Sequence, residues 1–451
     1  MWPEGDTTAI RLKEIVDRAE DLRVRRPRNV VSLTSAAAAV LVSGVVTVAV
    51  QAGAVPPGSV RVAAAEPSPS ASPSPSPSAS PTPATGLDSN LTAAIKSRMD
   101  NATSSSYAVV VDVEGRGRVV SINGGRSLLP ASTEKLFTTL PLLINHPNDR
   151  LDTVIGATSA PQSGVVHGDL VVRTSGDPTL MGFDLTTLAQ KVHDAGVRKV
   201  TGRLVLGYGS LPWTRTRPGW KSAYVPWDIG PLSPFAVHSD TWRTTAHYVA
   251  HPTGGNLGML RNKLVKAGVR VVGGIAAMHN PTIATTFGQH SSDTLAGIVR
   301  RTLRQSNNFY AEQLLNIEGW TPVIDVIKAA GSGGTATDGS GLSLSDRRTA
   351  AGEVALLKYA HSSSAASLLM QALPTACQTG TLKDEFCNTS GAGHVWAKTG
   401  TINQVKALAG YTTDAKGRWV TFAIITNGDS STSRAMKSIV NSVLQLRHYA
   451  G

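Results

Sequence analysis

Ser-Pro repeats occupy residues 66–85 and place the strongest constraint on what this 451-residue chain can fold into. Proline fixes φ and donates no backbone hydrogen bond, and serine buries little apolar surface, so such a segment cannot build a packed core. Extended as polyproline II, it reaches on the order of 60 Å at ~3.1 Å per residue. We therefore expect a disordered linker over residues 56–86 and a folded part that begins near residue 87.

The segment before this linker changes from basic to apolar. Residues 1–29 are polar and end in an arginine cluster, whereas residues 30–55 carry no charge and are long enough to span a bilayer. Basic flanks stay in the cytoplasm, so residues 1–29 are expected there. Residues 30–55 form either a transmembrane anchor, favoured by the long leading segment, or a signal segment cleaved at its small residues. Both alternatives place the remainder outside the cytoplasm.

Composition narrows the class of protein and of partner. The net charge is +12, and hydrophobic residues make up 41% of the chain, enough for a real core. The basic residues form no block with interleaved aromatics, so nucleic acid is not the expected partner. A membrane surface, acidic wall polymers or solubility alone would explain the charge. Cys377 and Cys387 either close one small loop, worth roughly 2–3 kcal/mol on the chain-entropy model, or remain free thiols.

Hydrophobic periodicity predicts a mixed α/β (α+β) fold after the linker. Residues 150–290 have short strands between Gly-rich turns, so we interpret them as an inserted, β-rich accessory region. Residues 87–149 and 291–451 then form one domain around it. The expected helices cover 88–99, a segment from Ser132 that Pro141 would kink or shorten, 185–195, 256–267, 291–318 and 435–446. The expected strands cover 107–113, 119–122, 170–173, 202–206, 269–272, 407–411 and 419–426.

The start of the helix near Ser132 carries a reactive pattern. Ser132 and Lys135 are three residues apart, so on a helix the amine lies one turn from the hydroxyl, on the same side. A serine is a weak nucleophile until a neighbouring base removes its proton. A helix N-terminus also offers free N–H groups that suit a developing oxyanion. Taken alone, the pattern fits a simple helix N-cap equally well.

Two further patterns follow the first in the chain. Ser-x-Asn occurs at residues 306–308, between two helical segments, and Lys-Thr-Gly occurs at residues 398–400, before two strand-like segments. Ser132 is the only serine followed by lysine at this spacing, and Lys-Thr-Gly occurs once. A second Ser-x-Asn, at residues 121–123, precedes the nucleophile and lies in a predicted strand. This ordered set is the signature of the penicillin-binding proteins and serine β-lactamases.

The resemblance extends beyond these three motifs. Gly-Asp-Pro at 176–178, Asp-Gly-Ser-Gly-Leu at 338–342, Leu-Pro at 373–374, Gly-Thr-Leu at 380–382 and Ala-Lys-Thr-Gly-Thr at 397–401 complete the pattern. Together they resemble the class C low-molecular-mass penicillin-binding proteins, D-alanyl-D-alanine carboxypeptidases and endopeptidases of the DacB type. This resemblance implies a penicillin-binding-protein/serine β-lactamase-like domain, an antiparallel sheet flanked by helices, with a large insertion between the first two motifs. The insertion is shorter here than in most relatives, and residues 207–210 stand where relatives tend to be acidic.

The resemblance also implies a catalytic role for five residues. Ser132 would attack the carbonyl of the penultimate D-Ala, and Lys135 would be the base, with a pKa depressed by burial and by Lys398. Ser306 would relay a proton to the leaving amine. Asn308 would hold the substrate amide and the Lys135 amine.

Substrate binding is expected at the third motif. Lys398, Thr399 and Thr401, with Gly400 between them, would bind the terminal carboxylate, and the N–H groups of Ser132 and Thr401 would form the oxyanion hole. The implied partners are peptidoglycan stem peptides that end in D-Ala-D-Ala, with β-lactam antibiotics as covalent inhibitors. No metal or cofactor is expected. The implied location is the extracytoplasmic side of a bacterial cell membrane.

Two other functions fit parts of the pattern. A serine β-lactamase needs fast deacylation, usually through an extra carboxylate between the first two motifs, and no such residue is identified. A non-catalytic cell-wall-binding scaffold with a retained fold would not need the intact motifs. The sequence does not separate carboxypeptidase from endopeptidase action, because both cut a D,D bond.

Overall fold

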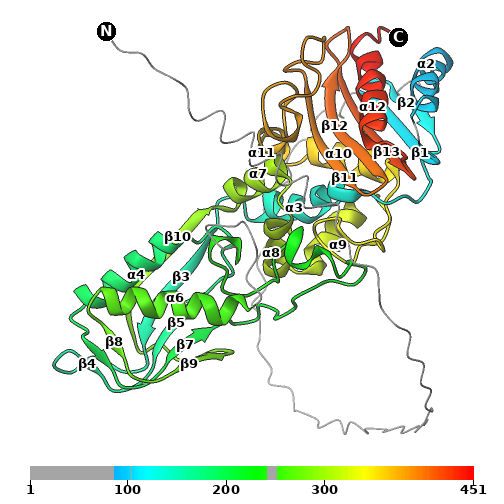
Figure 1. The fold of residues 1–451 in the computed structure, drawn as a ribbon. Coiled ribbons are helices and arrows are strands. Elements are labelled where there is room, and N and C mark those ends of the chain that lie inside the picture. Colours follow the sequence, from blue (N-terminus) through cyan, green and yellow to red (C-terminus); the bar gives the residue numbers. More distant parts are fainter. Residues whose placement is uncertain (1–85, 103, 241–250) are drawn as a thin grey trace, which may run out of the picture. The chain divides into compact units, whose positions relative to one another are not determined.

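Figure 1 shows the computed structural model of the chain, which describes residues 86–102, 104–240 and 251–451. The expected cytoplasmic segment, the membrane-spanning or signal segment and nearly all of the linker lie outside these residues. Within the described ranges, no helix is both long and apolar enough to cross a membrane. Every residue predicted for the site falls inside them.

A five-stranded antiparallel sheet joins the two ends of the folded part, in the order β11-β12-β13-β1-β2. Its N-terminal hairpin pairs with C-terminal strand β13, so that Ala108 lies opposite Ile425. The strands are β1 (Ser106–Val113), β2 (Gly117–Ile122), β11 (Val395–Ile402), β12 (Val405–Thr413) and β13 (Trp419–Asn427). The strands predicted at 107–113, 119–122, 407–411 and 419–426 are confirmed, and they belong to this one sheet.

Helices cover both faces of this sheet (Figure 1). Successive residues of a strand point to opposite faces, and Val109 and Val110 of β1 belong to two different hydrophobic clusters. Because both faces are buried, the central strands are almost continuously apolar. One face carries α2 (Ser89–Asp100) and α12 (Thr432–Arg447). The other carries α3 (Glu134–Asn145), α7 (Leu295–Gln305), α8 (Asn308–Glu318), α9 (Trp320–Ala329), α10 (Ala350–His361) and α11 (Ala366–Ala372).

Residues 150–294 build two further sheets. A five-stranded sheet has the order β10-β3-β5-β7-β9, and a three-stranded parallel sheet has the order β4-β6-β8. Parallel neighbours need a crossover, which α4 supplies between β5 and β7 and α6 supplies between β7 and β9. The elements are β3 (Arg150–Ala157), β4 (Val165–Val166), β5 (Leu170–Thr174), α4 (Gly182–Asp194), β6 (Lys199–Val200), β7 (Leu204–Gly207), α6 (Pro252–Lys266), β8 (Arg270–Val271), β9 (Ile275–Met278) and β10 (Thr285–Thr294).

Short helices complete the chain. They are η1 (Ala131–Thr133), α5 (Tyr224–Trp227), η2 (His238–Asp240) and η3 (Gly380–Leu382). Of these, η1 places the first motif, and η3 lies beside the third.

Two expectations about helices differ from the structure. The helix expected from Ser291 begins at Leu295, because residues 291–294 end β10 and the Thr294 side chain caps the helix by accepting from the Gly297 N–H. The helix after Ser132 is not ended by Pro141 but continues to Asn145. Almost all of that helix is buried, so tertiary packing outweighs the local cost of proline.

Candidate active site

Ser132 lies in η1, directly before α3, so its position at a helix start is confirmed. Two glycines allow other backbone segments to approach this turn closely. A Cβ on Gly400 would lie 2.6 Å from the Pro130 carbonyl oxygen, and one on Gly341 would overlap the Ala131 carbonyl oxygen. The third motif and the Gly-rich turn at 338–342 therefore pack against the nucleophile turn at backbone distance, which only glycine permits.

The Lys135 side chain is fully buried and points to three acceptors. Its Nζ lies 2.9 Å from Ser132 Oγ, 2.8 Å from Asn308 Oδ1 and 2.6 Å from the Ser340 carbonyl oxygen. An ammonium would donate to all three, whereas a neutral amine has a lone pair that can accept the serine proton. The structure thus brings three of the predicted catalytic residues into direct contact.

Burial is the main cause that makes Lys135 a candidate base. Removal from water disfavours its charged form and lowers its pKa to about 8, while the carboxylates of Asp338, Glu312 and Glu134 oppose this shift. A lysine at its ordinary pKa would be almost entirely protonated near neutral pH. The depressed pKa expected of Lys135 is therefore present.

Lys398 and Ser306 form the other side of the site. Lys398 is fully buried on β11, and its Nζ donates to Ser306 Oγ at 2.8 Å and to the Thr399 carbonyl oxygen at 2.7 Å. Burial and Lys398 were both expected to lower the pKa of Lys135, but only burial does so, and Lys398 is not among the causes of that shift. Instead, burial first and then Lys135 hold the pKa of Lys398 well below its usual value.

Ser306 and Asn308 are placed by a break between two helices. Ser306 ends α7 in the left-handed region, with φ of 54°. The Asn307 side chain then caps α8 by accepting from the Tyr310 N–H, so that Asn308 opens the new helix. This local turn separates the two side chains enough for Ser306 to contact Lys398 and for Asn308 to contact Lys135.

A pocket of about 210 Å³ opens beside the nucleophile. Its wall includes Thr399 and Thr401 from β11, and the Thr399 hydroxyl lies 2.7 Å from that of Thr381. The lining residues are Ser132, Ser306, Thr381, Glu385, Thr399, Thr401, Lys406 and Met436. The predicted substrate-binding threonines thus face the same space as Ser132, whereas Gly400 serves the close approach to Pro130 described above.

Glu312 is a supporting residue that the sequence did not single out. Its Oε1 accepts from the N–H groups of Gly339 (3.0 Å) and Ser340 (2.9 Å), and Arg217 Nε lies 2.9 Å from its Oε2. The Ser340 N–H therefore donates to Glu312, and the Ser340 carbonyl oxygen accepts from Lys135. Burial raises the pKa of Glu312 to about 7. A glutamate within a helix gives no local signal of burial, which explains why it was missed.

Asp338 organises the Gly-rich turn from its first position. Its carboxylate accepts from the N–H groups of Gly341 and Ser343, both at 2.7 Å, and from Trp220 Nε1 at 2.6 Å. The turn itself was recognised in the sequence, and the carboxylate at its start was the available signal. Trp220 and Arg217 come from the residues that follow β7. These residues therefore reach the Gly-rich turn and α8.

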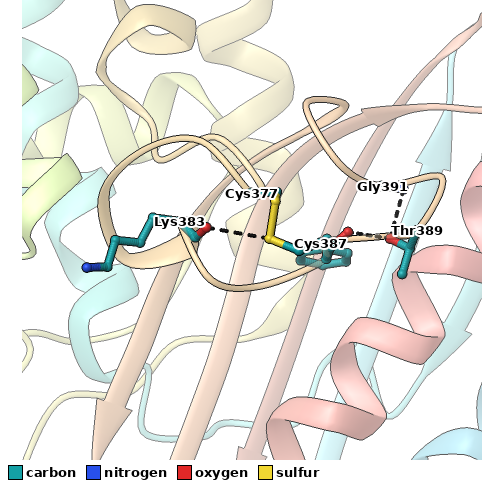
Figure 2. Close-up of a disulfide and its surroundings, with 6 residues drawn as sticks. Cys377, Lys383, Cys387, Thr389 and Gly391 are labelled. Atoms are coloured by element: carbon teal, nitrogen blue, oxygen red, sulfur yellow. Dashed lines mark hydrogen bonds between the residues drawn. A yellow bond between two sulfur atoms is a disulfide. The ribbon is translucent and has the colours of Figure 1, made fainter.

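A disulfide joins Cys377 to Cys387, as Figure 2 shows, which decides between the two expectations for these residues. The loop that it closes carries η3, with Thr381, and Glu385. Both residues line the pocket. The disulfide therefore restricts the movement of the loop that forms one wall of the pocket. Among the described residues, no cluster of histidine, cysteine and carboxylate groups is placed to hold a metal ion.

The fold and the site together define a class of protein. The site combines a serine at a helix start, a buried lysine 2.9 Å from its hydroxyl and a second lysine–serine pair beside an antiparallel sheet. This combination is an acyl-transfer site of the penicillin-binding type. A family model described as D-Ala-D-Ala carboxypeptidase 3 (S13) matches residues 89–246 and 236–447. Because the match spans most of the chain, this protein belongs to the D-Ala-D-Ala carboxypeptidase 3 (S13) family, and the resemblance noted in the sequence is confirmed.

Individual relatives agree with this assignment. Carboxypeptidase DacB of Mycolicibacterium smegmatis is 28% identical over 358 residues, which cover 70% of this chain and 75% of that protein. A D-alanyl-D-alanine carboxypeptidase of an Actinomadura species is 27% identical over 445 residues, covering 77% and 82%. The crystal structure of penicillin binding protein 4 from Haemophilus influenzae has the same fold, with a TM-score of 0.73 at 19% identity over 79% of this chain and 99% of that one.

Proposed function

We propose that this chain is a serine-type D-Ala-D-Ala carboxypeptidase that trims peptidoglycan stem peptides through an acyl-enzyme on Ser132, with D,D-endopeptidase action on cross-links as a second activity. The observation that carries the proposal is the 2.9 Å contact between Ser132 Oγ and the buried Lys135 amine, whose pKa burial lowers to about 8. Family membership supports the reaction class, and penicillin is expected to form the same ester with Ser132.

Acylation follows from the contacts at Lys135. The neutral amine accepts the Ser132 proton as Oγ bonds to the carbonyl carbon of the penultimate D-Ala. The N–H groups of Ser132 and Thr401 stabilise the oxyanion, roughly 3–4 kcal/mol per donor. The C–N bond then breaks as Ser306, which accepts from Lys398, relays to the leaving amine the proton that Lys135 took from Ser132, so that Lys135 is neutral again. Asn308 holds Lys135 in place throughout.

Deacylation returns the enzyme to its starting state. Water adds to the ester carbonyl, loses its proton to Lys135, and the Ser132 C–O bond breaks with return of a proton to Oγ. Thr399 and Thr401 bind the terminal carboxylate, because both line the pocket next to Ser132.

The test is product analysis of purified muropeptides incubated with the protein. Loss of the terminal D-Ala, detected by mass spectrometry, is expected from the wild type and not from Ser132→Ala. Benzylpenicillin should leave a long-lived adduct on Ser132. Rapid turnover of nitrocefin would favour a β-lactamase instead, and an unchanged cellular role of Ser132→Ala would favour a wall-binding scaffold.

The organisation of the chain is part of the proposal. We propose that residues 150–290 are an accessory region inserted into the catalytic domain formed by 87–149 and 291–451. Residues 30–55 would anchor the chain, or direct its export, and the linker at 56–86 would hold the site outside a bacterial membrane. Charge-free residues 30–55 and the Ser-Pro composition support this. Recovery of the protein in a soluble cytoplasmic fraction would argue against it.

A further inference from the structure

One cation beside the nucleophile has no role in the reaction described so far. Lys406 lies on β12, where the antiparallel register places it opposite Thr401 of β11. Its Nζ donates to the Thr401 hydroxyl at 2.9 Å, and its side chain lines the same pocket as Ser132 and Thr399. It is therefore in direct contact with a residue that we propose binds substrate.

The pocket around Lys406 has the size of a small terminal residue. At about 210 Å³ it is smaller than the ~300–1,000 Å³ of pockets that hold drug-sized ligands. Because Thr399 and Thr401 line this pocket, we assign it to the leaving residue and its carboxylate. Met436 is buried and supplies an apolar surface to the same pocket, next to the polar groups.

Lys398 is poorly suited to supply the positive charge that such a carboxylate requires. It is fully buried, and its amine already donates to Ser306 and to the Thr399 carbonyl oxygen. Burial and the neighbouring lysines hold its pKa well below the usual value, which favours the neutral form.

Lys406 is in a different electrostatic position. It is only partly buried, so water continues to solvate its ammonium. Burial lowers the pKa of Lys406, but the carboxylates of Glu385 and Asp429 raise it. Glu385 lines the same pocket, on the loop closed by the disulfide. Glu385 and Asp429 thus favour the charged form of Lys406. The lysines near Lys398 disfavour its charged form.

We propose that Lys406 is a specificity-determining residue, whose ammonium binds the free carboxylate of the leaving residue together with the Thr399 and Thr401 hydroxyls. This inference rests on the proposed carboxypeptidase function. The enzyme then selects acyl donors whose leaving group ends in a carboxylate next to the scissile bond. Lys398 is left to hold Ser306 for proton transfer.

A pair of thioester substrates isolates this contact. One is an N-acyl-D-alanyl thioester of mercaptoacetic acid, and the other is its methyl ester, which has the same scissile bond and no charge. In both, the bond from Ser132 Oγ to the acyl carbon forms, the C–S bond breaks and the thiol leaves with a proton. The released thiol is measured with a disulfide reagent.

Lys406→Met should lower kcat/KM for the acid by roughly 10- to 100-fold, the range for loss of a hydrogen bond to a charged group, and leave the methyl ester unchanged. Lys406→Arg should restore most of the activity on the acid. Lys383→Met removes an exposed lysine of the neighbouring loop, 69% accessible at its side chain, and should affect neither substrate. Equal losses on both thioesters, or no loss on the acid, would overturn the inference.

The proposed function fails in a different way. If the wild type forms no penicillin adduct and Ser132→Ala hydrolyses both thioesters as well as the wild type, the carboxypeptidase proposal is wrong. If the adduct forms on Ser132 and Lys406→Met retains full activity on the acid, only the role of Lys406 is wrong.

Discussion

Three lysines lie within the same site, and their surroundings give them different tasks. Lys135 is buried with three carboxylates nearby, Lys398 is buried with two other lysines nearby, and Lys406 is partly exposed with two carboxylates nearby. In the proposed reaction, the same type of side chain is therefore a base at Lys135, holds the Ser306 hydroxyl at Lys398 and binds the substrate carboxylate at Lys406. What differs is the free energy of the charged form, set by burial and by the neighbouring charges.

The protonation of Lys135 predicts how acylation depends on pH. Its pKa is lowered to about 8, so the neutral, proton-accepting form increases as pH rises through that value. The second-order rate constant for acylation by benzylpenicillin should therefore rise between about pH 6 and pH 9. Lys135→Arg, which stays protonated, should lose roughly 10²- to 10⁴-fold in that rate constant. A wild-type rate constant that is flat or falls over this range would contradict Lys135 as the base.

Among the secondary-structure elements, the site depends on how closely β11 and the turn at 338–342 approach η1. The backbone there leaves no room for a Cβ on Gly341, which also has φ of 77°. Gly417, in the turn before β13, has nearly the same φ of 76° but nothing within 4 Å. These two glycines allow the cost of the left-handed backbone to be separated from the cost of collision.

Gly341→Ala should therefore be far more damaging than Gly417→Ala. The second variant should cost about 1–2 kcal/mol in unfolding free energy, from backbone strain alone. The first should add about 1–3 kcal/mol of overpacking and should displace Ser132, slowing penicillin acylation. Urea unfolding and adduct formation measured on both variants test this, and equal effects would mean that the close approach is not needed.

The disulfide-closed loop is a second element that limits one pocket wall. Cys377→Ser combined with Cys387→Ser frees a loop with a sequence separation of 10, which should cost about 2–3 kcal/mol in stability on the chain-entropy model. Because Thr381 contacts Thr399 at 2.7 Å, we also expect KM to increase more than kcat decreases. Chemical denaturation and steady-state kinetics with and without a reductant would detect both effects. Unchanged stability would show that packing alone holds the loop.

At the scale of the folded part, the residues that follow β7 reach from the second sheet to α8. Arg217 of this segment forms an ion pair with Glu312 of α8, where the Glu312 side chain is fully buried. That glutamate accepts from the Ser340 N–H, and the carbonyl oxygen of the same residue accepts from Lys135. The residues of 150–290 thus contribute to the site although none of them was predicted to do so.

Arg217→Ala should destabilise the protein by about 3 kcal/mol at alkaline pH and by less at acidic pH. Glu312 already has a raised pKa of about 7, and loss of Arg217 raises it further. A raised carboxyl pKa means that the folded state binds more protons than the unfolded state, so stability falls as pH rises towards that pKa. Urea unfolding at about pH 6 and pH 9 measures the difference, with exposed Lys221→Ala as the control from the same segment. A loss independent of pH would exclude the proposed coupling.

How much of the site could be predicted depended on sequence distance. Ser132 and Lys135 are one helical turn apart, so local geometry was sufficient. Lys135 and Ser340 are 205 residues apart, and only the packed fold brings them together. Lys406 could have been found from the hairpin register opposite Thr401, but no local pattern reveals Glu385 and Asp429, whose carboxylates raise its pKa against the effect of burial.

The sequence by itself determined the nucleophile, the order of the motifs, most helices and strands and the family, because these depend on local periodicity and on residue spacing. Only the tertiary structure decided that Lys135 loses its contact with water, that Glu312 and Asp338 hold the turn beside it, and that Cys377 and Cys387 pair. Desolvation and long-range hydrogen bonds are properties of the packed chain as a whole. The Ser132–Lys135 spacing is therefore specified locally, and the pKa of Lys135 is set by residues from distant parts of the chain.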